Sequence, residues 1–528
     1  MHDDRRATTN HRMIRLTAAL VLASTLAVSA LSCSDAPPSS DASSSDACAS
    51  APVRGAGFDA YGGWKGVTTD ATGRFQVAEI DGVWWLITPD GHGLFSNGVT
   101  GIDPEGDVTG AGRQPYGENV LARYGSVEGW AAATLERMCD LGVTTLAAWT
   151  NSAIYLFAGK RAYPVSIAFY GTAPEVAGWP VGLTGAHLRD VFDPSWPDVA
   201  RGYAHDSQPL ADCAADAWCY GAFVDNELPW AATTLSVGTH LDAFLSQPAG
   251  APGKRALQEF FAQRYSGDVA ALNAAWDLEL DSFDELQQLT RATACPLVEP
   301  LGEDTCLKAE PAARRTDRMA FEGVVARRYA EVMRAAFDAA APGVLNLGVR
   351  FFSIYTPPEV VRAIVPFVDV VSLNDYDYGA VERPGLVNLS GGPEFGYLFG
   401  HDSFSDLATL HELSGKPVLI GEWFYRVHRT DGASGALPPL FPQVETHEQQ
   451  GIAYRAYTER LLSLPYVIGY HWFQWMDQPF EGRAAGGENQ WIGVVDIEDN
   501  PREPLASAMR EVNASLIERR TALAIPGS

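Results

Sequence analysis

The chain alternates short apolar runs with longer segments whose apolar residues recur at helical spacing. After residue 73, β-type residues are interrupted by turns at Asp81-Gly82 and Asp90-Gly91, which predicts a β-hairpin ahead of the main domain. Eight later apolar runs fit buried parallel strands, because such strands are covered on both faces and lack polar alternation. These runs are residues 95–102, 143–149, 165–170, 222–224, 344–351, 367–373, 418–420 and 467–475.

Segments with helical periodicity separate the runs. They include residues 127–141, 196–217, 319–340 and 505–517. Eight strands alternating with helices predict an α/β fold, a (β/α)8 TIM barrel. The stretch between Glu227 and Leu345 is far longer than one helix needs, so we expect an inserted segment between strands four and five. A doubly wound sheet is the structural alternative, but no glycine-rich phosphate loop follows the first strand.

Two of the apolar runs end in a glutamate. Residues 222–224 lead into Asp225-Asn226-Glu227, and residues 418–420 lead into Gly421-Glu422. In a parallel barrel the carboxyl ends of the strands meet at the face where catalytic groups collect. A glutamate beside a turn is the ordinary interpretation of one such residue alone. Two of them, at strands four and seven, favour a paired-carboxylate site of the kind that hydrolyses glycosides.

Several motifs resemble the β-agarases of glycoside hydrolase family fifty. They are Trp84-Trp85-Leu86-Ile87-Thr88-Pro89-Asp90-Gly91-His92 with Phe95-Ser96-Asn97-Gly98, Val224-Asp225-Asn226-Glu227, Gly421-Glu422-Trp423, His471-Trp472-Phe473-Gln474-Trp475, Asp477-Gln478-Pro479 and Gly487-Glu488-Asn489. The resemblance covers most of residues 73–504. Residues 272–276 and 282–286 also resemble an element of the family forty-two β-galactosidases.

The resemblance implies a retaining glycoside hydrolase that cleaves β-1,4 galactosidic bonds of agarose or agaro-oligosaccharides. Glu227 would be the general acid and base, and Glu422 the nucleophile. Asn226 is placed to bind the 2-hydroxyl of the sugar, and Tyr376 to orient Glu422 or simply to form a wall. Weaker substrate-binding candidates are Asn97 and Arg350, and Arg350 equally fits a structural ion pair.

The segment after the last strand supplies four further substrate-binding candidates. Trp472 and Trp475 fit flat platforms for sugar rings, although a single tryptophan is more often a packing residue. Asp477 and Gln478 follow directly and add polar groups.

Two other functions remain open on the sequence. One is a β-galactosidase-like glycosidase that acts on other galactans or oligosaccharides. The other is an inactive sugar-binding surface lipoprotein, against which the presence of both glutamates argues. We expect no cofactor and no metal, because the chain contains no His-x-His and no His-Glu-x-x-His. It also contains no Gly-x-Ser-x-Gly elbow of a serine esterase.

The amino-terminal region has the pattern of an export signal. Residues 1–32 combine a basic start with an apolar segment too short to span a bilayer, and Ala30-Leu31-Ser32-Cys33 resembles a lipobox. We therefore expect export, with a lipid on Cys33 as the membrane anchor or, alternatively, ordinary secretion. Residues 33–53, rich in Ser, Asp, Ala and Pro, predict a tether before the catalytic domain at 54–528. Family-fifty agarases often carry a β-sandwich domain there, so the tether predicts short substrates or attack from chain ends.

Composition limits the classes of binding partner that we expect. The chain has 528 residues, 46% hydrophobic, with 14 tryptophans, which suits a large core and a carbohydrate site. Its formal net charge of −27 argues against nucleic acid as a partner, because a polyanion would be repelled. Of the seven cysteines, Cys213 with Cys219 and Cys295 with Cys306 are close enough in sequence to predict disulfides in an oxidising compartment.

Overall fold

A computed structural model describes residues 55–156, 161–179, 187–230, 239–289, 312–352, 356–376, 403–431, 442–484 and 486–524. The chain divides into two units, residues 1–42 and 43–528, and the described residues all belong to the second. The predicted signal segment, the tether with Cys33, and the predicted Cys295–Cys306 disulfide lie outside the described residues. Among the helices of the described ranges, none combines the length and apolar character that a bilayer crossing requires.

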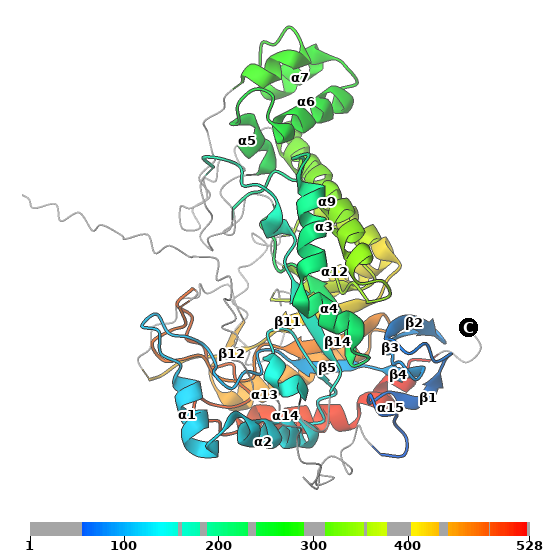
Figure 1. Cartoon of the computed structure of the whole chain (residues 1–528), viewed down its shortest axis with the longest axis vertical. Helices are drawn as coiled ribbons and strands as arrows, with labels where there is room; N and C mark the ends of the chain where they lie inside the picture. Colours follow the sequence, from blue (N-terminus) through cyan, green and yellow to red (C-terminus); the bar gives the residue numbers. More distant parts are fainter. Residues whose placement is uncertain are drawn as a thin grey trace, which may run out of the picture. The chain divides into compact units, whose positions relative to one another are not determined.

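The first folded element is a four-stranded antiparallel sheet with the order β1-β4-β3-β2 (dark blue in Figure 1). Its strands are β1 (Trp64–Thr68), β2 (Gln76–Ile80), β3 (Val83–Ile87) and β4 (His92–Leu94). Asp81 and Gly82 join β2 to β3, and both have positive φ, 51° and 75°, as a tight two-residue hairpin requires. The predicted hairpin is confirmed.

The centre of the fold is a six-stranded sheet with the order β6-β5-β14-β11-β10-β9, in which every pairing is parallel. Its strands are β5 (Ser96–Val99), β6 (Thr145–Leu146), β9 (Phe351–Phe352), β10 (Val371–Asn374), β11 (Val418–Trp423) and β14 (Val467–Trp472). All their residues are buried, as the apolar runs predicted.

Strands β7 (Tyr163–Ile167) and β8 (Cys219–Val224) form a separate parallel pair. Backbone contacts connect this pair to both sides of the six-stranded sheet. A parallel bridge pairs Thr145 of β6 with Ala162, the residue before β7. On the other side, a parallel bridge pairs Ala222 of β8 with Asn346, and Val224 N–H donates to the carbonyl of Gly348 at 3.0 Å. Backbone hydrogen bonds thus continue from both edges of the six-stranded sheet to the pair.

Helices follow the strands in the order the periodicity predicted, with three differences in their bounds. The helices outside residues 239–340 are α1 (Pro115–Tyr124), α2 (Val127–Asp140), α3 (Trp196–Asp206), α4 (Gln208–Ala215), α10 (Pro358–Ile364), α12 (Ser403–Ser414), α13 (His447–Leu462), α14 (Glu503–Ala514) and α15 (Leu516–Thr521). The segment predicted as one helix at 196–217 breaks at Ser207, which caps α4 ahead of Pro209. The carboxyl-terminal helix likewise breaks at Ser515. The strand predicted at residues 367–373 begins later than expected, because Phe367 ends the 3-10 turn η4 (Val365–Phe367) and β10 begins at Val371.

Between β8 and β9 the described chain is helical. We call residues 239–289 and 312–340 the helical segment; it contains α5 (His240–Leu245), α6 (Pro252–Arg264), α7 (Val269–Trp276), the 3-10 turn η3 (Phe283–Gln288) and α9 (Ala312–Ala340). The long helix α9 packs along α3 and also against α5, α7 and α10 (Figure 1). The disulfide Cys213–Cys219, with Cα atoms 5.1 Å apart, ties α4 to β8 and confirms that predicted pair.

Candidate active site

The end of β8 carries Asp225, Asn226 and Glu227 in an unusual backbone conformation. Asp225 and Glu227 both have positive φ, 64° and 49°. A left-handed residue other than glycine costs about 1–3 kcal/mol and persists only where the surrounding structure enforces it. The Asp225 carboxylate accepts hydrogen bonds from Tyr329 and from the backbone N–H groups of Phe169 and Tyr170. Burial raises the pKa of Asp225 to about 6. The hydrogen bonds to Asp225, the first residue of the strained turn, therefore hold the turn in place.

Glu422, at the end of β11, is held by three donors. The indole N–H of Trp149 donates to Oε1 at 2.7 Å, and Arg350 donates to the same oxygen. The hydroxyl of Tyr376 donates to Oε2 at 2.7 Å. Only 5% of Glu422 is exposed. Its carboxylate is thus oriented by hydrogen bonds on both oxygens and neutralised by one buried guanidinium.

A chain of amide and guanidinium contacts links the two acids. Asn374, directly opposite Glu422 in the β10–β11 register, donates to Glu227 Oε1 at 2.7 Å and to Asn226 Oδ1 at 3.1 Å. Arg350 donates from Nε to Asn226 Oδ1 at 2.8 Å and from Nη2 to Glu422. Glu227, Asn374, Asn226, Arg350 and Glu422 therefore form one network across the ends of three strands and the segment before β9.

The two acids differ electrostatically. Burial, followed by the negative charge of Glu422, raises the pKa of Glu227 from its ordinary 4.5 to about 8. Glu227 consequently holds a proton at neutral pH, while the Glu422 carboxylate is surrounded by donors. An acid poised to give a proton beside a carboxylate poised to attack is the arrangement that splits a glycosidic bond in two steps.

Residues next to this network shield Arg350 from solvent. Arg350 is fully buried, and its guanidinium lies over the ring of Phe223 at 4.7 Å and over Trp149 at 5.4 Å. His471 on β14 contacts Ser96 Oγ through Nε2 at 2.9 Å. Burial, and next the charge of Arg350, lower the pKa of His471 to about 3, so the imidazole is neutral at neutral pH. Arg350 therefore remains the cation available to Glu422.

Five of the ten residues singled out from the sequence meet at this network: Glu227, Glu422, Asn226, Tyr376 and Arg350. Tyr376 contacts Glu422 directly, as the orienting role required. Arg350, which the sequence left as a weak candidate, bridges the nucleophile candidate and Asn226.

The tryptophans expected as sugar platforms are packing residues instead. Trp472 is 1% exposed and Trp475 is 0% exposed. The indole N–H of Trp472 donates to the carbonyl of Ile492 at 2.7 Å, and its ring packs edge-on to Trp423. Because protein covers these rings, neither presents a face to a sugar. The prediction was wrong for both.

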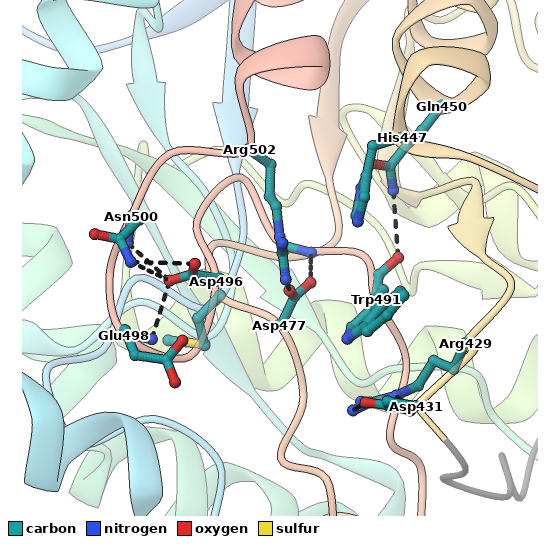
Figure 2. Close-up of polar contacts among 12 residues, drawn as sticks. Arg429, Asp431, His447, Gln450, Asp477, Trp491, Asp496, Glu498, Asn500 and Arg502 are labelled. Atoms are coloured by element: carbon teal, nitrogen blue, oxygen red, sulfur yellow. Dashed lines mark hydrogen bonds and ion pairs between the residues drawn. The ribbon is translucent and has the colours of Figure 1, made fainter.

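Asp477 and Gln478 are likewise used within the protein. Asp477 accepts from Arg502 Nε at 3.0 Å and from the N–H of Gly493 at 2.7 Å, and the pair with Arg502 is drawn in Figure 2. Gln478 Oε1 accepts from the N–H of Gln490 at 2.8 Å. Both residues are 2% exposed, so they brace the loop after β14 rather than line a site.

Asn97 points to the other face of its strand. Its side-chain amide donates to the carbonyl of Gly142, just beyond α2, at 3.3 Å. The neighbouring Ser96 contacts Thr145 and His471 on the inner face. Successive strand residues alternate between faces, so assigning Asn97 to the site was one position out of register.

Sequence reasoning missed three residues of the site. Asn374 and Trp149 contact the acids directly, and the charge of Glu488 contributes to the raised pKa of Glu227. Asn374 ends an apolar run just as Glu227 and Glu422 do, so the strand-end rule could have found it. Trp149 also ends a predicted strand, and its positive φ of 63° and 46% exposure show only in the structure.

Comparisons with known proteins point to carbohydrate hydrolases. No protein-family model matches the chain. β-Agarase B and β-agarase A of Vibrio sp. (strain JT0107) are 25% identical over 525 residues and 26% identical over 502 residues. The matches cover 87% and 83% of this chain but 50% and 45% of the relatives, so the chain spans about half the length of the curated relatives it matches.

Solved structures agree on the fold. An exo-β-agarase has a TM-score of 0.69 at 24% identity, covering 88% of this chain and 68% of that chain. A second agarase has a TM-score of 0.69 at 23% identity, covering 90% and 69%. The curated relatives and these solved structures are thus agarases, the group whose motifs this sequence resembles.

Proposed function

We propose that this chain, a relative of the family-fifty β-agarases, is a retaining glycoside hydrolase that cleaves β-1,4 galactosidic bonds of agarose or its oligosaccharides. The observation that carries the proposal is the pair of linked acids in different surroundings. Glu227 has a pKa raised to about 8, and Glu422 receives donors on both oxygens. The similarity to curated β-agarases supplies the substrate class.

The geometry suits a double displacement. A Glu422 oxygen attacks the anomeric carbon while Glu227 gives its proton to the departing glycosidic oxygen, leaving a covalent glycosyl-enzyme. Glu227, now ionised, takes a proton from water as the water oxygen attacks the same carbon and releases Glu422. Arg350 and Tyr376 hold the attacking carboxylate in one orientation. The described contacts of Asn226 use its Oδ1, which supports a role for its NH2 group as donor to the 2-hydroxyl of the sugar.

The strand ends would lie on the open face of a closed eight-stranded barrel. The order from β5 through β6, β7, β8, the segment at Asn346, β10, β11 and β14 back to β5 supports this inference. The helical segment would then be the insertion between strands four and five. A barrel of this kind presents its catalytic groups from the ends of several strands, as Trp149, Glu227, Asn374 and Glu422 are presented.

Export with lipidation at Cys33 remains a proposal that rests on the lipobox-like Ala30-Leu31-Ser32-Cys33. The domain division that goes with it is a signal at 1–32, a tether at 33–53 and a hydrolase domain at 54–528. We expect the protein to partition with membranes and to become soluble on Cys33→Ala. An unmodified amino terminus downstream of Cys33, found by mass spectrometry, would contradict this expectation.

A reducing-sugar screen over agarose, neoagaro-oligosaccharides, porphyran, carrageenan and plant galactans tests the activity. We expect products from agarose or its oligosaccharides, with the anomeric configuration retained when the reaction is followed by NMR. Activity confined to simple β-galactosides such as lactose would indicate a β-galactosidase instead. Sugar binding without any product would indicate an inactive binding protein. Inversion at the anomeric carbon would exclude the double displacement.

A further inference from the structure

Helix α9 reaches the catalytic strand end through the side chain of Tyr329. The hydroxyl of Tyr329 donates to Asp225 Oδ2 at 2.5 Å, across 104 residues of sequence. The same oxygen accepts from the N–H groups of Phe169 and Tyr170, both at 3.0 Å. Tyr329 is fully buried and Asp225 is 7% exposed. Three donors from two different parts of the chain therefore converge on the residue that begins the Asp225-Asn226-Glu227 turn.

The turn needs such an anchor. Asp225 and Glu227 are both left-handed, and a conformation of this kind relaxes unless its surroundings enforce it. The backbone supplies some restraint, because Asp225 N–H donates to Ile167 at 2.7 Å and Glu227 N–H donates to Arg350 at 3.3 Å. The Asp225 side chain supplies further restraint, and its direct partner on α9 is Tyr329.

A second set of contacts connects α9 to Tyr170, whose backbone also binds Asp225. Glu322, seven residues before Tyr329 and so about two turns away on the same face of the helix, accepts from His240 N and contacts His240 Nδ1, both at 2.7 Å. His240 Nε2 contacts the hydroxyl of Tyr170 at 2.9 Å. The backbone N–H of Tyr170 then donates to Asp225. The contacts close a ring from α9 through His240 and Tyr170 to Asp225 and back through Tyr329.

Aromatic packing keeps the Tyr329 ring in place. Trp196 of α3 lies nearly parallel to it, with ring centroids 6.3 Å apart and an interplanar angle of 15°. Trp230, three residues beyond Glu227, also packs against Tyr329, with ring centroids 5.9 Å apart and an interplanar angle of 65°. The packing thus restricts the Tyr329 ring and holds its hydroxyl group against Asp225.

We propose that Tyr329 and Asp225 are positioning residues, which hold Glu227 where it can transfer its proton to the departing glycosidic oxygen. This inference rests on the proposed hydrolase function. It assigns the helical segment a role in catalysis, because the segment carries the anchor of the general acid. Neither residue touches the substrate; each acts through the backbone of the turn.

Tyr265 offers a matched control. Its hydroxyl donates to Asp317 Oδ2 at 2.5 Å, and Asp317 lies on α9, as Tyr329 does. Asp317 also accepts from Arg264 and Trp276, so these contacts lie within the helical segment. Tyr265→Phe and Tyr329→Phe therefore remove the same kind of hydrogen bond, and only the second bond leads to the catalytic turn.

The experiment compares kcat/KM for two aryl β-glycosides of an oligosaccharide that the wild type hydrolyses, one with a dinitrophenol and one with an unsubstituted phenol as leaving group. Dinitrophenolate departs without a proton, whereas phenol requires one from Glu227. Tyr329→Phe should lower kcat/KM for the phenyl substrate by about 10- to 100-fold, as expected for a displaced catalytic group. The same substitution should leave kcat/KM for the dinitrophenyl substrate near the wild-type value. Tyr265→Phe should keep the wild-type ratio of the two values.

Equal losses on both substrates, or the same ratio as in Tyr265→Phe, would overturn the inference and leave Tyr329 with a purely structural role. Circular dichroism and thermal unfolding establish that each variant is folded. Should Tyr329→Phe not fold, Asp225→Asn provides the same comparison, because it weakens the acceptor of the same bond. A wild type that hydrolyses neither substrate nor any galactan would remove the proposed function, and this inference with it.

Discussion

The strand-end site and the helical segment both bury carboxylates against basic side chains, yet they balance charge differently. In the helical segment three buried acids each contact a basic side chain: Asp242 contacts Arg318, Glu322 contacts His240, and Asp317 contacts Arg264. At the strand ends, Glu227 and Glu422 share Arg350, which binds Glu422 directly. The surplus negative charge, together with burial, leaves Glu227 protonated at neutral pH. Burial is common to both regions, so the imbalance of charge distinguishes the site that can do chemistry.

The largest effect should come from removing the attacking carboxylate. Glu422→Gln keeps an oxygen that can accept from the surrounding donors but lacks the charge needed for attack. We expect kcat to fall by about four to six orders of magnitude, with the fold retained. Steady-state kinetics and circular dichroism measure both. Turnover close to the wild-type rate would exclude Glu422 as the nucleophile.

Within the helical segment, the Asp242–Arg318 pair should affect stability rather than chemistry. Arg318 donates to both oxygens of Asp242, and Arg318→Ala would leave that carboxylate buried without this partner. We expect a loss of about 3–5 kcal/mol in the free energy of unfolding, measured by urea denaturation. At urea concentrations below the unfolding transition, the kcat of Arg318→Ala should remain within a few-fold of the wild-type kcat. A large loss of kcat in the folded variant would contradict this separation of roles.

A substitution that preserves charge sharpens the comparison. Lysine in place of Arg350 keeps the positive charge but cannot bond Asn226 and Glu422 together, because its ammonium is a point charge. Arg350→Lys should lower kcat/KM about 10- to 100-fold, since a hydrogen bond to a charged group contributes about 1.5–3 kcal/mol. Arg318→Lys, the matched change in the helical segment, should leave kcat/KM unchanged. Equal effects on kcat/KM would show that Arg350 acts only as a charge.

The raised pKa of Glu227 also predicts a pH dependence of stability. Because the pKa of Glu227 is raised from 4.5 to about 8, the folded protein binds this proton more tightly than the unfolded chain does. The resulting contribution to stability is present below about pH 4.5 and is lost as the pH rises through about 8. Glu227→Gln should therefore raise the unfolding temperature relative to wild type more at pH 9 than at pH 5. An equal difference at both pH values would mean that the pKa is not raised.

Much of the site followed from position along the chain. Glu227 and Glu422 lie within three residues of the end of an apolar run, and the ends of parallel strands meet at one edge, so position along the chain predicted that the two acids would meet. The same rule selected Tyr376 and, more weakly, Arg350, and it could have selected Asn374. The hairpin at Asp81-Gly82 and the disulfide Cys213–Cys219 were equally local, since each depends on residues within one turn or one short loop.

What the sequence could not determine was the direction of side chains once the chain leaves a strand. Trp472 and Trp475 follow the same rule as the acids, yet the loop after β14 packs back onto the protein and buries both rings. Trp149, from the end of another predicted strand, turns instead toward Glu422.

Contacts between distant parts of the chain decided the rest. Tyr329 meets Asp225 across 104 residues, and Arg350 acquires its role from Asn226 and Glu422, which lie on other strands. The sequence by itself determined which residue types reach the ends of the strands, because hydrophobic periodicity is a local property. Which of them face one another, and which acid keeps its proton, was decided only by tertiary structure, because burial and electrostatic coupling depend on neighbours that folding brings together.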